Sequence, residues 1–225
     1  MLWVNCDSSV TKRPAAAAAP RDARISPESV YYLTQSNDRG MTVIFSYLRT
    51  WRFARRITAM HAAIGIPADY ALRRALPLQP EARRLVSVGP DIYRREQRLL
   101  APAATAWHEM VSAASRDGVQ LQLVSAYRSV DYQEKILRKK LDKGQAIDEI
   151  LQVSAAPGFS EHHSGRAVDV TTPGYPVLEE VFEDSEAFAW LSEHAGTFGF
   201  RLSYPRDNRH GVAYEPWHWA WRGDR

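Results

Sequence analysis

The sequence has almost no cysteine and no long hydrophobic run, the features that cross-link small secreted proteins and anchor membrane proteins. Its single cysteine, Cys6, cannot form an internal disulfide, so a disulfide framework is excluded. No stretch is long and apolar enough to span a bilayer, and the N-terminal residues do not resemble a signal peptide. The 225 residues are 45% hydrophobic and 24% charged, which is typical of a globular protein that buries a core without disulfides.

Charge is distributed unevenly along the chain. The net charge is +3 overall, but residues 41–84 carry eight arginines against Asp69 and Glu81, whereas residues 85–225 have a net charge of −4. A basic segment thus precedes a mildly acidic region, and residues 41–60 are a candidate contact with an anionic surface. We expect no nucleic-acid partner because the region after residue 84 is acidic overall, although aromatic residues lie among the arginines.

Three segments are predicted from these patterns. Residues 1–40 have no periodic pattern and are expected to be disordered, residues 41–84 form a basic helical extension, and residues 85–225 form the main domain. A helix is expected over residues 42–64, with an apolar stripe on one face and arginines on another. Either the stripe packs on the main domain and the arginines are solvated, or the helix lies on an anionic surface. The stripe consists of Ile44, Tyr47, Leu48, Trp51, Ala54 and Thr58, and the arginines are Arg49, Arg52 and Arg56.

The main domain mixes helices and short strands without a regular alternation. This order favours an α+β fold with a small, largely antiparallel sheet flanked by helices. Asp131, with Glu134 three residues later, is expected to cap one helix, and Pro102 lies near the start of another. Helices are expected over 95–118, 131–143, 146–153 and 186–198, and strands over 119–125, 166–170, 200–204 and 212–221.

The segment SEHHSGRAVDV, residues 160–170, carries potential metal ligands around a turn. His162 and Asp169 are seven residues apart, so on one straight strand they would point to opposite faces. They converge only if His162 lies on a loop and Gly165 lets the chain turn before Asp169. An imidazole and a carboxylate brought together in this way suit zinc, which needs a third protein ligand in a catalytic site.

The third ligand is expected in YEPWHW, residues 214–219. His218 offers a second imidazole, and Glu215 can act as general base for a water molecule activated by the metal. Arg128, in SAYRS, follows a predicted strand and can stabilise an oxyanion or bind a substrate carboxylate. The alternative interpretation of Arg128 is a solvated surface arginine.

Four segments, namely SAYRS, SEHHSGRAVDV, GFRLSYP and YEPWHW, together resemble the VanY-type D-alanyl-D-alanine carboxypeptidases. These belong to a group of zinc peptidases with a Hedgehog-like α+β fold, and the resemblance covers roughly residues 85–225. Their pattern is Ser-x-His-x-x-Gly-x-Ala-x-Asp followed by Glu-x-x-His. The resemblance implies that Zn²⁺ is bound by His162, Asp169 and His218, that Glu215 is the catalytic base, that Arg128 stabilises the oxyanion and that Ser160 contacts substrate.

The resemblance also implies a substrate and a place of action. The expected reaction removes the terminal D-Ala from peptidoglycan stem peptides. The alternatives are a D,D-dipeptidase, an L-Ala-D-Glu endopeptidase, or a cell-wall-binding module without turnover. The substrate implies the cell envelope, but the lack of a visible signal peptide leaves a cytoplasmic role open. His163 matches a variable position, so we expect a structural role for it.

Overall fold

A computed structural model describes the backbone of residues 40–223 and the side chains of residues 50–223. The expected disorder of residues 1–40 lies almost entirely outside these residues. Tertiary contacts group Ile44–Arg225 into one compact unit, which contains all the predicted site residues. Within the described residues, no helix combines the length and the hydropathy needed to cross a bilayer.

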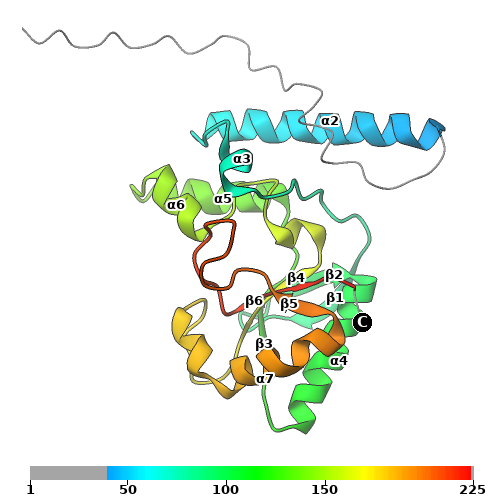
Figure 1. The fold of residues 1–225 in the computed structure, drawn as a ribbon, viewed down its shortest axis with the longest axis vertical. Coiled ribbons are helices and arrows are strands. Elements are labelled where there is room, and N and C mark those ends of the chain that lie inside the picture. The colour runs from blue at the N-terminus through cyan, green and yellow to red at the C-terminus, as the bar shows by residue number, and fades with distance from the viewer. Residues whose placement is uncertain (1–39, 224–225) are drawn as a thin grey trace, which may run out of the picture. The chain divides into compact units, whose positions relative to one another are not determined.

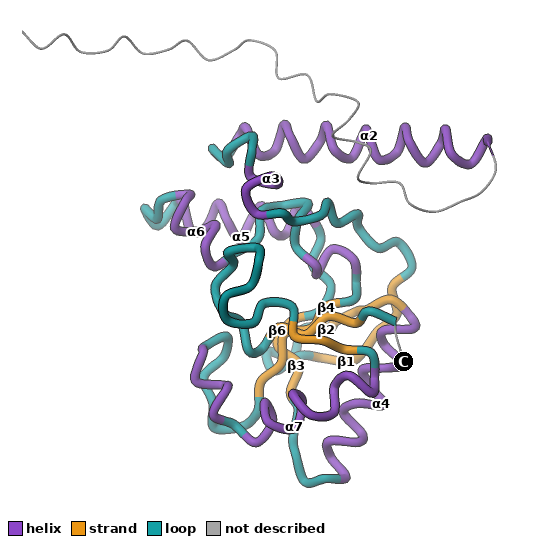
Figure 2. The backbone as a smooth tube through the Cα atoms, viewed as in Figure 1, coloured by secondary structure: helices purple, strands orange, loops and turns teal. Residues whose placement is uncertain are grey.

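Two antiparallel sheets form the centre of this unit (Figure 2). The larger sheet has the strand order β3-β4-β6-β5, and the smaller is the hairpin of β1 and β2. Together with the surrounding helices, this arrangement confirms the predicted α+β fold. The strands are β1 (Leu85–Pro90), β2 (Glu96–Leu100), β3 (Gln122–Ser125), β4 (Ala167–Thr171), β5 (Phe200–Leu202) and β6 (His218–Trp221).

Helices pack on both sides of the sheet region and bury two hydrophobic clusters. The first cluster joins Val168 and Val170 of β4 to Met110 and Leu191 on the helices drawn below the strands in Figure 1. Those helices are α4 (Ala101–Arg116), α7 (Glu186–His194) and the 3-10 turns η3 (Glu180–Asp184) and η4 (Ala195–Phe198). The second cluster joins α2 (Gly40–Ala63), α3 (Tyr70–Arg74), α5 (Val130–Leu141) and α6 (Ile147–Val153).

The basic helix is present, but a different face of it is buried from the one expected. Ile57 and His61 are buried, whereas Trp51, which belongs to the expected stripe, is 44% exposed. Arg56 forms ion pairs with Glu81 and Asp131 instead of being merely solvated. The packed face of the described side chains therefore runs through Phe53, Ile57 and Met60, not through Trp51 and Thr58.

Three other expectations about the elements are wrong. Residues 96–100 form β2, not the start of a helix, and the helix begins at Ala101 with Pro102 in its first turn, where a missing N–H costs nothing. The hydroxyl of Ser129, not Asp131, caps α5 by accepting from the Tyr132 N–H. The final strand starts only at His218, because the segment before it turns, with His218 N–H donating to the Glu215 carbonyl.

Candidate active site

Asp169 and His218 meet because their strands are neighbours. Asp169 is the middle residue of β4, His218 is the first residue of β6, and the two are direct partners in the antiparallel register. Directly opposed residues point to the same face of a sheet. Val168 and Val170 point into the first hydrophobic cluster, so Asp169 between them faces the other way, toward the predicted site.

His162 reaches the same place from a turn. It lies on the 3-10 turn η2 (Glu161–Ser164), which ends at Gly165 in the left-handed conformation with φ 65°. A side chain at Gly165 would come within 2.7 Å of Leu85 Cδ2, so both the backbone angle and the space favour glycine. The predicted turn before Asp169 is therefore present.

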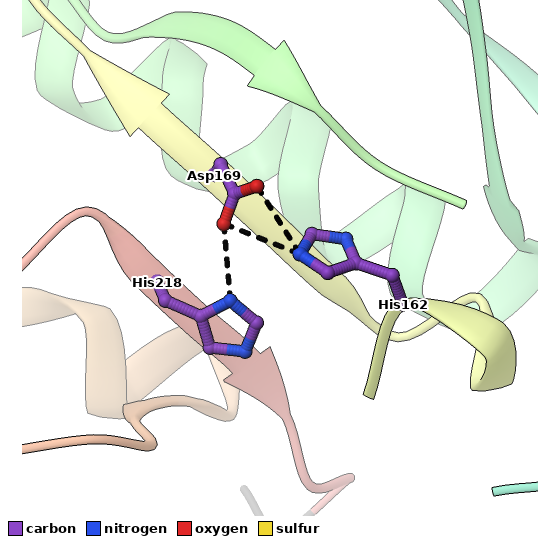
Figure 3. Close-up of side chains that lie close together, drawn as sticks. All are labelled: His162, Asp169 and His218. Carbon is purple, nitrogen blue, oxygen red and sulfur yellow. Dashed lines mark hydrogen bonds and ion pairs between the residues drawn. The ribbon is translucent and has the colours of Figure 1, made fainter. Parts of the chain in front are cut away.

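The three side chains form one compact, buried cluster (Figure 3). His162 Nε2 lies 3.2 Å from the Asp169 carboxylate, and His218 Nδ1 lies 3.0 Å from Asp169 Oδ1. One ligand atom from each residue lies within 4.8 Å of the others. Two imidazole nitrogens and one carboxylate are the donor set of many catalytic zinc sites, so these residues fit such an ion.

Both imidazoles are oriented by a second hydrogen bond. His162 Nδ1 lies 2.5 Å from the Ala126 carbonyl oxygen, which directs Nε2 toward Asp169. His218 Nε2 lies 3.1 Å from Glu161 Oε2, which directs Nδ1 toward Asp169. Metal-binding histidines are held in this way, with the outer N–H donated to a carbonyl or a carboxylate.

Glu161 is a member of the site that the sequence did not reveal. Its carboxylate accepts hydrogen bonds from Ser203 Oγ at 2.6 Å and from Arg222 Nη2 at 2.7 Å, in addition to its contact with His218. These partners keep the pKa of Glu161 well below its usual range, although burial opposes ionisation. Glu161 is therefore a fixed anion behind His218.

The two imidazoles of the cluster lie in different electrostatic surroundings. Burial and the nearby Arg128 guanidinium lower the pKa of His162 to about 4. Burial also opposes protonation of His218, but hydrogen bonds to Asp169 and Glu161 raise the pKa of His218 to about 10. The carboxylates thus dominate around His218, which is the electrostatic condition that a cation site requires.

Glu215 lies beside the cluster without being part of it. Its Oε2 atom is 3.8 Å from His218 Nδ1, and its backbone N–H donates to the Tyr204 carbonyl at 3.1 Å. Burial raises the pKa of Glu215 to about 7; the neighbouring His218 opposes this rise, and the Asp169 carboxylate adds to it. A carboxyl with this pKa can exchange a proton near neutral pH.

Arg128 points into the site and is not a surface residue, since only 22% of its side chain is exposed. Its Nη2 atom lies 3.4 Å from Asp169 Oδ2, and its Nη1 donates to Gln133 Oε1 at 3.3 Å. Its buried Nε has no hydrogen-bond partner among the described residues. Gln133, which the sequence did not single out, is anchored in turn because its Nε2 donates a hydrogen bond to the Ala155 carbonyl at 2.8 Å.

Ser160 and His163 flank the ligand His162. Ser160 is buried and precedes η2 as its N-terminal capping residue. His163 points away from the ligand cluster: its Nδ1 lies 2.6 Å from the Arg128 carbonyl, and its Nε2 accepts the Gly158 N–H at 3.1 Å. Burial lowers the pKa of His163 to about 4, so the neutral ring joins these two backbone segments.

Curated relatives are similar to this chain over a little more than half of its length. A D-alanyl-D-alanine carboxypeptidase of Enterococcus faecalis is 34% identical over 125 residues, which are 51% of this chain and 45% of that protein. The bifunctional D-Ala-D-Ala dipeptidase and D-Ala-D-Ala carboxypeptidase VanXYC of Enterococcus gallinarum is 31% identical over 138 residues, which are 59% of this chain and 69% of that protein. The match thus spans less than half of the first relative.

Solved structures of carboxypeptidases and related peptidases also match this chain. The LD-carboxypeptidase LdcB matches with 29% identity and a TM-score of 0.57, over 64% of this chain and 71% of that chain. A vancomycin-resistance D,D-pentapeptidase VanY, solved in complex with Zn(II), matches with 26% identity and a TM-score of 0.51, over 67% of this chain and 89% of that chain. The family model of the D-alanyl-D-alanine carboxypeptidase VanY matches residues 96–224, more than half of the sequence. The predicted resemblance is therefore confirmed, and this chain belongs to the VanY D-alanyl-D-alanine carboxypeptidase family.

Proposed function

We propose that this chain is a zinc-dependent D,D-carboxypeptidase that removes the terminal D-Ala from peptidoglycan stem peptides. The observation that carries the proposal is the buried cluster of His162, Asp169 and His218, with Glu215 next to His218. The substrate class is supported by the name of the Enterococcus faecalis relative and by a neighbour, VanYB, solved in complex with D-Alanine-D-Alanine at 28% identity and a TM-score of 0.51.

Each member of the cluster has a distinct task in this proposal. His162 Nε2, the Asp169 carboxylate and His218 Nδ1 would hold the zinc ion. When bound, zinc polarises a carbonyl group and lowers the pKa of water toward ~7. Glu215 accepts the proton of the attacking water and later donates it to the leaving amine, for which a pKa of about 7 is well suited.

Arg128 and Ser160 would act on the substrate. The Arg128 guanidinium can donate hydrogen bonds to the oxyanion that develops on the scissile carbonyl. Gln133 and Asp169 hold this guanidinium in place before substrate binds. Ser160 immediately precedes the turn that carries His162, and in this proposal its hydroxyl contacts the bound peptide.

Mass spectrometry of a stem pentapeptide ending in D-Ala-D-Ala tests the proposal directly. The zinc-loaded protein is expected to remove one alanine, and a chelator is expected to abolish the reaction. Loss of a dipeptide, or cleavage at the L-Ala end, would instead indicate a dipeptidase or an endopeptidase. Cleavage only of a tetrapeptide would indicate the L,D activity named for LdcB, and no cleavage of any wall peptide would favour a binding module.

Replacing the proposed base separates catalysis from metal binding. We expect Glu215→Ala to lower kcat by about 10²-fold or more, the usual contribution of general acid–base catalysis, while zinc stays bound. Zinc content and turnover are measured on the same sample. Glu193→Ala, at a side chain that is 78% exposed, is the matched control. Turnover that survives in Glu215→Ala would refute the assigned base.

We also propose that the exposed side of α2 associates with anionic lipid headgroups. Trp51 is 44% exposed, and the guanidinium of Arg55 lies 5.0 Å from the centre of its ring. Arg52 and Arg55 are both exposed, and no acidic residue occurs between Arg39 and Asp69. An amphipathic aromatic ring beside two exposed arginines favours the interface of an anionic membrane.

A further inference from the structure

The segment Arg56–Leu85 lies before the residues that the family model matches, yet it contacts the loop that carries the site. Three consecutive residues of that loop are held by hydrogen bonds from this segment. The Ala156 N–H donates to the Tyr70 hydroxyl at 3.1 Å, and the Pro157 carbonyl oxygen lies 2.8 Å from His61 Nε2. The Gly158 carbonyl accepts a hydrogen bond from the backbone N–H of Gln79 at 2.7 Å.

Side-chain packing strengthens this contact. The Phe159 ring lies 5.5 Å from the Tyr70 ring and 5.7 Å from the His61 ring, and His61 itself is buried. Ile57 closes against Gly158, where an added Cβ would come within 2.8 Å of the Ile57 side chain. Gly158 also has φ +85°, so the close approach and the backbone conformation both depend on glycine.

The far end of the loop is held by the same segment. The Ala82 N–H donates to the His163 carbonyl at 2.8 Å, and Gly165 packs against Ala82 and Leu85. The Glu81 carboxylate accepts the Val130 N–H at 2.7 Å, two residues after Arg128. The segment therefore contacts the loop 155–165 both before Ser160 and after His162.

A loop of this kind needs such partners because its buried backbone groups have no strand or helix to pair with. We propose that Arg56–Leu85 is a positioning element of the active site, in which His61 holds the loop 155–165 so that Ser160 and His162 face Asp169. This inference rests on the proposed function for the roles of Ser160 and His162. It assigns to the N-terminal extension a part in the site, because small displacements of a ligand or a substrate contact are costly for metal binding and for turnover.

The experiment compares His61→Leu with His61→Gln in the full chain. Glutamine keeps an N–H donor near the position of His61 Nε2, whereas leucine removes it. Leu191→Ala is the control, because it removes buried volume from the first hydrophobic cluster, away from the loop. All variants are measured at a temperature well below their midpoints of thermal unfolding, so that each is folded.

Two readouts are taken. Hydrogen exchange of residues 155–165, followed by mass spectrometry, needs no metal and is expected to be at least ~10-fold faster in His61→Leu, near wild type in His61→Gln and unchanged in Leu191→Ala. Co²⁺ titration followed by visible absorption is expected to give ~10-fold weaker binding and an altered spectrum in His61→Leu only.

Each outcome decides the inference. Unchanged loop exchange in His61→Leu would overturn it, and so would equal changes of Co²⁺ binding in His61→Leu and Leu191→Ala. If His61→Leu does not fold, Tyr70→Phe takes its place, because it keeps the ring and removes only the acceptor of the Ala156 N–H. If the wild type binds no Co²⁺, the proposed function fails, and loop exchange alone still decides whether the segment positions the loop.

Discussion

The orientation of His218 depends on Glu161, a residue that binds no metal itself in the proposed site. Glu161 accepts from the outer nitrogen of His218 and is fixed by Ser203 and Arg222. We expect Glu161→Gln to weaken zinc binding about 10-fold, because an amide keeps the shape but loses the negative charge that favours the Nε2–H tautomer and the basicity of Nδ1. Competition with a chelating indicator measures the affinity.

Glu193→Gln makes the same change at an exposed position and is expected to leave zinc affinity unaltered. Equal affinities in the wild type and Glu161→Gln would mean that Glu161 only packs against His218. The mutation of Ser203 to Ala, which removes one support of Glu161, should produce a smaller effect of the same sign.

At this scale the sequence revealed the candidate ligands but not the residues that support them. His162, Asp169 and His218 stand in fixed spacings, and the structure brings them together. Glu161 adjoins His162 in sequence, yet it contacts a residue 57 positions away. The register that opposes β4 to β6 decides this contact, and nothing local to residue 161 encodes that register.

Among the elements, the hairpin of β1 and β2 supports the site from a distance. Asp91 Oδ2 accepts from Gln97 Nε2 at 2.8 Å, and Gln97 Oε1 accepts the Ala126 N–H at 3.0 Å. The Ala126 carbonyl then holds His162. The sequence did not predict this hairpin, because Glu96–Leu100 has few β-branched residues and runs directly into a helix.

Asp91 therefore makes a testable contribution to stability. Burial opposes its ionisation, but hydrogen bonds from the Arg95 backbone and side chain and from the Tyr93 N–H lower the pKa of its carboxyl. Asp91→Asn loses these charge-assisted bonds, so we expect the free energy of unfolding to fall by about 1.5–3 kcal/mol at pH 7. Urea unfolding measures the change.

The pH dependence has a definite sign. Because the pKa of Asp91 is lower in the folded chain, its contribution is complete above its unfolded pKa, roughly 3.9, and is lost as the pH falls through the folded value. The difference between wild type and Asp91→Asn should thus shrink below about pH 4. Asp184→Asn, at an exposed position, serves as control, and a difference independent of pH would refute this assignment.

For the molecule as a whole, the distribution of charge and the order of the predicted elements indicated the charge asymmetry and the fold class, but not how the extension packs. Apolar periodicity alone could not choose between the two faces of α2, because Trp51 and Ile57 both lie on helical stripes. The surface formed by α5 and the loop 155–165 determines which face of α2 is buried, and it covers Ile57 and His61. Trp51 is left at the solvent beside the arginines, which leads to the last prediction.

The exposed arginines of α2 should make membrane association salt-dependent. In sedimentation with vesicles rich in phosphatidylglycerol, we expect the wild type to bind at low ionic strength and to be released near physiological salt or above, because screening weakens such contacts. The double variant Arg52→Gln/Arg55→Gln should bind at least ~10-fold more weakly. Lys135→Gln/Lys139→Gln removes the same charge from exposed positions of α5 and should bind like the wild type. Equal losses of binding in both double variants would show that only net charge matters. Binding by both double variants as strong as that of the wild type would place the lipid contact elsewhere in the chain.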